Sequence, residues 1–231
     1  MPTDPKPLDD KNKTGLWIAF FVGLALLIAS MIVAAGNALG GWQASIFHAI
    51  NNESGSLTNF AKFITEALGA AYPIAICVIV PLLFKKYRLA WRFFFTAGGA
   101  IVAGFAVKYL VNEPRPEAIL HHHDIHVRAI ETGPGFPSGH MLAATSLALT
   151  LWFILPKAWR WVSVLWILLV AWSRLYLGVH TPADIISGFS IGLMAVCFVR
   201  LLPPSIAKPL RLDEPVASPA PQKKPVHTQN A

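Results

Sequence analysis

Long apolar runs alternate with short polar segments along this chain. The first run covers residues 16–35, contains no charged residue, and as an α-helix would measure about 30 Å, the thickness of a bilayer's hydrocarbon core. Unpaired backbone N–H and C=O groups are not tolerated in lipid, so each run is predicted to be helical. The pattern predicts an all-α bundle of six transmembrane helices, the later ones covering approximately residues 67–84, 93–110, 138–155, 161–177 and 184–202.

The segments between and beside these runs complete the organisation. Residues 36–66 mix apolar and polar positions at roughly helical spacing, which predicts interfacial helices after the first span. Residues 111–137 form a long loop, and loops of this length in compact folds are often functional. We therefore expect one membrane domain at 15–203, between a cytoplasmic segment at 1–14 and a disordered cytoplasmic tail at 204–231.

Composition and charge support a membrane protein with a defined orientation. Only 13% of the residues are charged and 55% are hydrophobic, whereas soluble domains carry about 25% charged residues. The net charge of +7 arises from clusters between apolar runs, which disfavours a nucleic-acid-binding face. Placing both termini in the cytoplasm puts 14 of the 19 lysines and arginines on that side. The remaining cations are Lys62, Lys108, Arg115, Arg128 and Arg174.

Three polar stretches lie at the outer ends of predicted spans and can form an anion site. Lys108, Arg115 and Arg174 supply positive charge, and the arginine fork fits phosphate oxygens. Ser138 is placed to cap a helix whose first N–H groups, at Gly139 and His140, would face outward and attract an anion. Some of these residues, taken singly, also have a purely structural alternative. Lys108 and Arg174 can extend to the membrane interface, and Ser138 can serve only as a helix cap.

Two histidines beside these cations suggest phosphoryl transfer without a metal. His180 and His140 can supply a nucleophile and a proton, while the cations stabilise the phosphoryl oxygens. Asp184 can orient His180 through one ring nitrogen. Asp184 also has a structural alternative, as the acidic residue in the first turn of a helix capped by Thr181.

Together the stretches resemble the signature of the type 2 phosphatidic acid phosphatase family. K-x6-R-P matches at 108–116, P-S-G-H at 137–140 and S-R-x5-H-x3-D at 173–184. The resemblance implies that His180 forms a phosphohistidine, Asp184 orients it and His140 protonates the leaving oxygen. It further implies that Lys108, Arg115, Ser138, Gly139 and Arg174 hold the phosphate.

The resemblance also implies a substrate and a location. Members of this size in bacteria act on undecaprenyl pyrophosphate, phosphatidylglycerol phosphate or phosphatidic acid. With the orientation predicted from the cations, we expect a protein of the bacterial cytoplasmic membrane with its active site on the outer face. We expect a lipid phosphate or pyrophosphate substrate, no cofactor, and hydrocarbon chains entering between the third and fourth spans. A lipid phosphotransferase with the same site is the nearer alternative, and a transporter or proton pathway is the distant one.

The loop at 111–137 carries two further candidates. His121, His122, His123, Asp124 and His126 can form a metal site, but adjacent histidines lack helical ligand spacing, which favours a solvated segment. A lid over the headgroup is a further alternative. Arg128 can contact the second phosphate of a pyrophosphate.

Overall fold

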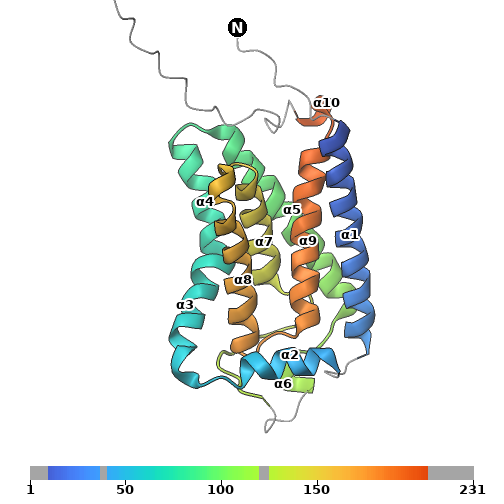
Figure 1. Cartoon of the computed structure of the whole chain (residues 1–231), viewed down its shortest axis with the longest axis vertical. Coiled ribbons are helices and arrows are strands. Elements are labelled where there is room, and N and C mark those ends of the chain that lie inside the picture. The colour runs from blue at the N-terminus through green and yellow to red at the C-terminus, as the bar shows by residue number, and fades with distance from the viewer. Residues whose placement is uncertain (1–9, 37–40, 120–124, 208–231) are drawn as a thin grey trace, which may run out of the picture.

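The chain folds into an upright bundle of helices (Figure 1). The computed structural model describes residues 10–36, 41–119 and 125–207, and no strand occurs in these segments. Their helices are α1 (Asp10–Ala35), α2 (Trp42–Asn51), α3 (Thr58–Gly69), α4 (Ala71–Leu83), α5 (Tyr87–Val111), α6 (Pro116–Ile119), α7 (Gly139–Trp152), α8 (Trp161–Tyr176), α9 (Pro182–Leu201) and α10 (Pro204–Ala207), with short 3₁₀ turns at Gly55–Leu57 and Lys157–Trp159. The predicted all-α class is confirmed.

The structure differs from the predicted count of six spans in two places. Four helices are long and apolar enough to cross a bilayer, or five if α3 and α4, which bend by 41° at their junction, form one span. That junction is the extended residue Ala70, and α3 extends the second span into residues predicted as interfacial. By contrast, α2 lies across the end of the bundle, as an interfacial helix would (Figure 1).

The remaining predicted span corresponds to α7, which is shorter than expected. Its 14 residues reach about 21 Å, less than a hydrocarbon core of about 30 Å. The helix packs against α5, α8 and α9, and every residue from Met141 to Ala148 is buried. Protein therefore surrounds α7 where lipid would surround an outer helix, so its apolar sequence makes the core of the bundle.

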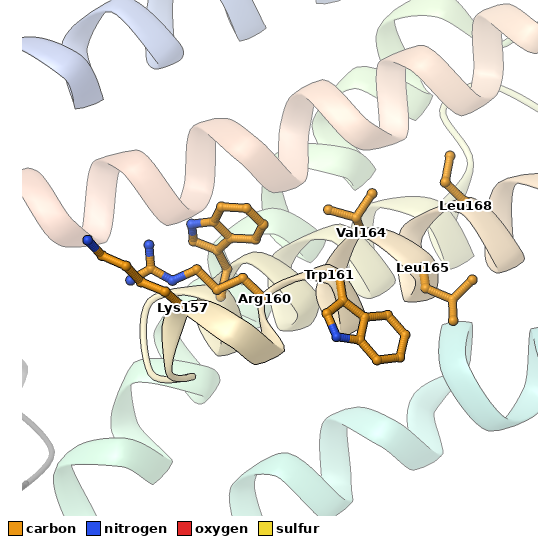
Figure 2. Close-up of a pocket in the computed structure, with 7 residues that line it drawn as sticks. Lys157, Arg160, Trp161, Val164, Leu165 and Leu168 are labelled. Carbon is orange, nitrogen blue, oxygen red and sulfur yellow. The ribbon is translucent and has the colours of Figure 1, made fainter.

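One end of the bundle carries both described chain ends together with basic and aromatic side chains (Figure 1). The N-terminal end of α1 and the C-terminal end of α9 lie together, opposite the end that carries α2 and α6 (Figure 1). At the end of α8 near these termini, Lys157 and Arg160 lie beside Trp161 in an open hollow whose wall continues along α8 to Leu168 (Figure 2). Lysine, arginine and tryptophan at the end of an apolar helix are typical of a membrane interface.

Candidate active site

Lys108 and Arg115 reach the site through the end of α5. Lys108 is in the last turn of α5, and its Nζ donates to the carbonyl of Pro134 at 2.7 Å. Asn112, in the left-handed region at φ 45°, ends the helix and redirects the chain. Asparagine tolerates this conformation better than most residues. The turn brings Arg115 over the same loop that Lys108 contacts.

The Arg115 guanidinium is held on several sides. Its Nε donates to the Gly133 carbonyl at 3.1 Å and its Nη1 to the Val179 carbonyl at 3.0 Å. Nη1 also pairs with the Glu131 carboxylate at 2.9 Å. These bonds fix the plane of the fork, so the donors point in a defined direction before any ligand arrives.

The P-S-G-H stretch begins α7, as predicted. The Ser138 hydroxyl accepts from the N–H of Met141 at 3.4 Å, and the Ser138 N–H donates to the Asp184 carbonyl at 3.1 Å, which joins the starts of α7 and α9. Gly139 and His140 occupy the first turn, where backbone N–H groups lack partners within the helix. Gly69 lets the α3–α4 junction approach, since a Cβ there would lie 3.1 Å from the His140 Cβ.

Arg174 points inward from the last turn of α8. The residue is 1% exposed, so the alternative that it extends to the interface is wrong. Its Nη1 donates to the Thr65 hydroxyl at 2.9 Å, and its Nη2 forms an ion pair with Glu131. Thr65 belongs to α3, so the bent span helps to position this guanidinium.

His180 and Asp184 form a buried pair at the start of α9. The His180 Nδ1 lies 3.1 Å from the Asp184 Oδ2, which also accepts from the N–H of Thr181 at 2.8 Å. Thr181 and Asp184 form a capping box, so the Asp184 carboxylate both caps α9 and contacts His180. With Nδ1 donating to the carboxylate, the Nε2 of His180 carries the lone pair.

Glu131 is the residue that the sequence reasoning missed. Its carboxylate bridges Arg115 and Arg174 and lies 3.9 Å from the Nε2 of His180. We call Arg115, Glu131 and Arg174 the anion cluster. The available signal was an acidic residue in the loop predicted to be functional, but nothing in its spacing marked it. A carboxylate thus lies where the predicted phosphate site expects an anion.

The electrostatics of the cluster favour a neutral histidine beside a charged carboxylate. Burial lowers the pKa of His180 well below its usual 6.5, and nearby Arg174 and Arg115 lower it further. Burial by itself would raise the pKa of Glu131, but the charge of Arg174 and its hydrogen bond to the carboxylate outweigh burial and hold that pKa at about 2. An unprotonated His180 is the form that acts as a nucleophile.

A second group of residues holds the start of the described 125–137 part of the loop against α2 and α8. We call this group, Asn51, Arg128 and Tyr176, the loop clamp. Arg128 donates from Nη1 to the carbonyls of Asn51 at 2.8 Å and Tyr176 at 2.6 Å, and from Nη2 to that of Glu53 at 2.7 Å. Its guanidinium also lies 4.4 Å from the centroid of the Tyr176 ring. These contacts turn Arg128 away from the predicted role on a second phosphate.

The histidine-rich stretch is only partly defined. Asn51 donates from Nδ2 to the His126 carbonyl at 3.0 Å and accepts from the His126 N–H at 2.7 Å. His126 therefore anchors the loop through its backbone. Residues 121–124 lie outside the described segments.

The eight predicted residues therefore come from three separated stretches to one end of the bundle. Six of them make hydrogen bonds or ion pairs given above, and Gly139 follows Ser138 in the first turn of α7. His140 lies close enough to influence the Glu131 carboxylate electrostatically. Ser138 is engaged as the cap of α7, so its side chain serves the helix start. The predicted set is Lys108, Arg115, Ser138, Gly139, His140, Arg174, His180 and Asp184.

Comparison with known proteins identifies the family of this chain. A family model described as the PAP2 superfamily matches residues 88–206. An undecaprenyl-diphosphatase of Sulfolobus acidocaldarius is 29% identical over 179 residues, covering 76% of this chain and 85% of that protein. The undecaprenyl-diphosphatase BcrC of Bacillus subtilis is 27% identical, covering 73% of this chain and 89% of that protein.

Solved structures share the fold. Aquifex aeolicus LpxE superposes with a TM-score of 0.63 at 24% identity, covering 70% of this chain and 96% of that chain. A transmembrane PAP2-type phosphatidylglycerolphosphate phosphatase from Bacillus subtilis gives a TM-score of 0.60 at 22% identity, covering 77% and 93%. At these identities the likeness concerns the fold.

Proposed function

Because this chain belongs to the PAP2 superfamily, we propose that it is an integral membrane phosphatase acting on a phosphomonoester or diphosphate of a lipid headgroup. The candidate substrates are of the undecaprenyl diphosphate, phosphatidylglycerol phosphate and phosphatidic acid types, the first named for two relatives. One observation carries the proposal: the Nε2 of His180 faces a carboxylate that two arginines hold. A phosphoryl group taking that place would meet both its cations and its nucleophile.

In the first step the Nε2 lone pair of His180 attacks phosphorus. Asp184 accepts a hydrogen bond from the Nδ1–H of His180 and stabilises the positive charge that develops on the ring. Arg115 and Arg174, with the first-turn N–H groups of α7, bind the phosphoryl oxygens as charge shifts onto them. The phosphorus–oxygen bond to the lipid breaks, and the leaving oxygen takes a proton from His140.

In the second step water attacks the phosphohistidine. His140, now neutral, accepts a proton from that water, the phosphorus–nitrogen bond breaks, and inorganic phosphate leaves with His180 restored. Lys108 adds positive charge at the same end of α5. Glu131 must move aside for the phosphate to enter, and its return would assist product release by competing for the two arginines.

The proposed topology has six spans, with α7 as the central one. Both described chain ends lie at the end of the bundle that carries Lys157 and Arg160 (Figure 1). The excess of cations there favours a cytoplasmic location for both termini. The site then faces the outside of a bacterial cytoplasmic membrane, where a lipid headgroup reaches it while the hydrocarbon remains in the bilayer.

Phosphate release from purified protein tests the proposal. The full chain in detergent should release inorganic phosphate from undecaprenyl diphosphate or another lipid of the three types. His180→Ala should abolish release, while His48→Ala, a histidine on α2 outside the cluster, should retain it. A brief incubation with labelled substrate should leave an acid-labile, alkali-stable label on the wild-type protein and none on His180→Ala.

The outcomes separate the alternatives. Wild-type turnover by His180→Ala contradicts the mechanism. Label that passes to an acceptor lipid in place of water identifies a phosphotransferase using the same residues. Absence of turnover on every lipid phosphate tested would remove the enzyme assignment.

A further inference from the structure

An apolar groove runs along the membrane part of the bundle, outside the anion cluster. Its volume is about 830 Å³, within the usual range for ligand pockets. Its floor is α9, and its walls are α1 and α5, which pack little against each other. We call it the α1–α5–α9 groove.

Two adjacent glycines in the middle of α5 keep the groove open. A Cβ at Gly98 or Gly99 would meet no neighbouring atom within 4 Å, so neither glycine is needed for close packing. A glycine inside a helix costs about 1 kcal/mol relative to alanine. On the same helix, a Cβ at Gly104 would collide with Leu142 of α7, so that glycine does serve close packing. Gly98 and Gly99 instead provide empty space.

The tight contact at Gly104 also bears on the expected path for the substrate's chains. The seam between α5 and α7, the third and fourth predicted spans, is closed where Leu142 lies against Gly104. The open space borders the other side of α5, toward α1 and α9. This groove therefore offers the hydrocarbon chains more room than the expected α5–α7 seam does.

The groove begins near the site and extends far from it. At one end it is lined by Val107, the neighbour of Lys108, and on α5 it continues to Phe94. The thirteen helical steps from Phe94 to Val107 rise about 20 Å, whereas half of a hydrocarbon core is about 15 Å thick. Acyl chains anchored in the leaflet of the site end near the midplane, so they would fill only the near part of the groove.

Resting on the phosphatase function proposed above, we propose that the α1–α5–α9 groove binds one long hydrocarbon chain of the substrate, of the polyprenyl class, and selects for chain length. Such a chain extends past the midplane and reaches Phe198 and the far end of the groove. Lipid tails are as apolar as the groove walls, so discrimination arises from shape and van der Waals contact and is moderate.

Filling the groove tests the proposal. Gly99→Leu and the double variant Gly98→Leu/Gly99→Leu add bulk where no atom blocks it, and both raise helix propensity. We expect kcat/KM for undecaprenyl diphosphate to fall about tenfold, the lower end of discrimination by an apolar pocket. Turnover of farnesyl diphosphate, which has the same headgroup and a short chain, should not change.

Two controls accompany these variants. Ala75→Leu places bulk on the exposed face of α4, away from the groove, and should leave both substrates unaffected. Gly99→Ala adds one methyl group and should have a smaller effect than Gly99→Leu. Thermal unfolding and gel filtration verify that each variant is folded.

Each other outcome overturns the inference. An unchanged rate on the long chain means that bulk lipid alone occupies the groove. An equal loss on both substrates means that the substitutions act on the site or fold and not on the chain. If the wild-type enzyme hydrolyses neither diphosphate but does hydrolyse a diacyl lipid phosphate, the polyprenyl inference fails while the phosphatase proposal stands.

Discussion

The same loop supplies two arginine-centred groups that differ in what the arginines bind. In the loop clamp, Arg128 donates to backbone carbonyls at the ends of α2 and α8 and at Glu53, which cannot rotate away as a side chain can. In the anion cluster, Arg115 and Arg174 pair with the side chain of Glu131, which can rotate aside. Arg115 also donates to backbone carbonyls, so what sets it and Arg174 apart from Arg128 is the additional carboxylate partner, which they can exchange for a phosphate. The acceptor, more than the arginine, separates the two roles.

The largest effect should follow a change beside the anion cluster. In Asp184→Asn the amide can direct its NH₂ toward His180 and favour the wrong tautomer, so kcat should fall about 10³–10⁴-fold, as in other histidine–aspartate pairs. Ser187→Ala on the same helix, whose hydroxyl donates to the Asp184 carbonyl, is the control and should stay near wild type. Steady-state kinetics measure both. A nearly normal kcat for Asp184→Asn would show that Asp184 serves only to cap α9.

A smaller effect is expected from Glu131. Glu131→Gln removes the charge that competes for Arg115 and Arg174, so inorganic phosphate should inhibit about tenfold more strongly, equivalent to about 1.4 kcal/mol. Glu131→Asp keeps the charge and should lie closer to wild type. Inhibition constants check this, and weaker inhibition in Glu131→Gln would show that the carboxylate holds the arginines in place rather than competing for them.

The pH dependence should show the cluster's electrostatics. His180 must be neutral to attack, and burial with Arg174 and Arg115 keeps its pKa well below 6.5. As pH falls, His180 therefore stays unprotonated past the point where an ordinary histidine takes up a proton. We expect the acidic limb of the kcat/KM profile below pH 6.5, and loss of the protonated general acid to produce a basic limb. An acidic limb at or above pH 6.5 would contradict the described burial.

The smallest effect on chemistry should come from the loop clamp. Arg128→Ala removes a donor from three carbonyls, of which that of Tyr176 still accepts from the Nδ2 of Asn51, and should lower stability by about 1–3 kcal/mol, seen as a lower unfolding temperature. The kcat/KM of the folded fraction should change little. Arg128→Lys keeps the charge without the fork and should recover part of the stability. A selective loss on diphosphates over monophosphates would instead return Arg128 to the substrate site.

Sequence alone predicted much of this arrangement. Apolar runs identified α1, α5, α8 and α9, because a helix in lipid must be long and uncharged, and this requirement is local. The motif residues were predicted because their chemistry and spacing recur as a set. The capping of α7 by Ser138 and of α9 by Thr181 was also predictable, since a cap depends on neighbouring residues.

Other features depend on contacts between distant residues and needed the three-dimensional structure. Glu131 pairs with a guanidinium 43 positions away, and Arg174 reaches a threonine 109 positions away, which no local pattern encodes. The same holds for α7, whose apolar residues resemble a lipid-facing span although neighbouring helices bury them. Hydropathy records that a side chain avoids water, but whether it meets lipid, protein or an open groove depends on the packing of the helices around it.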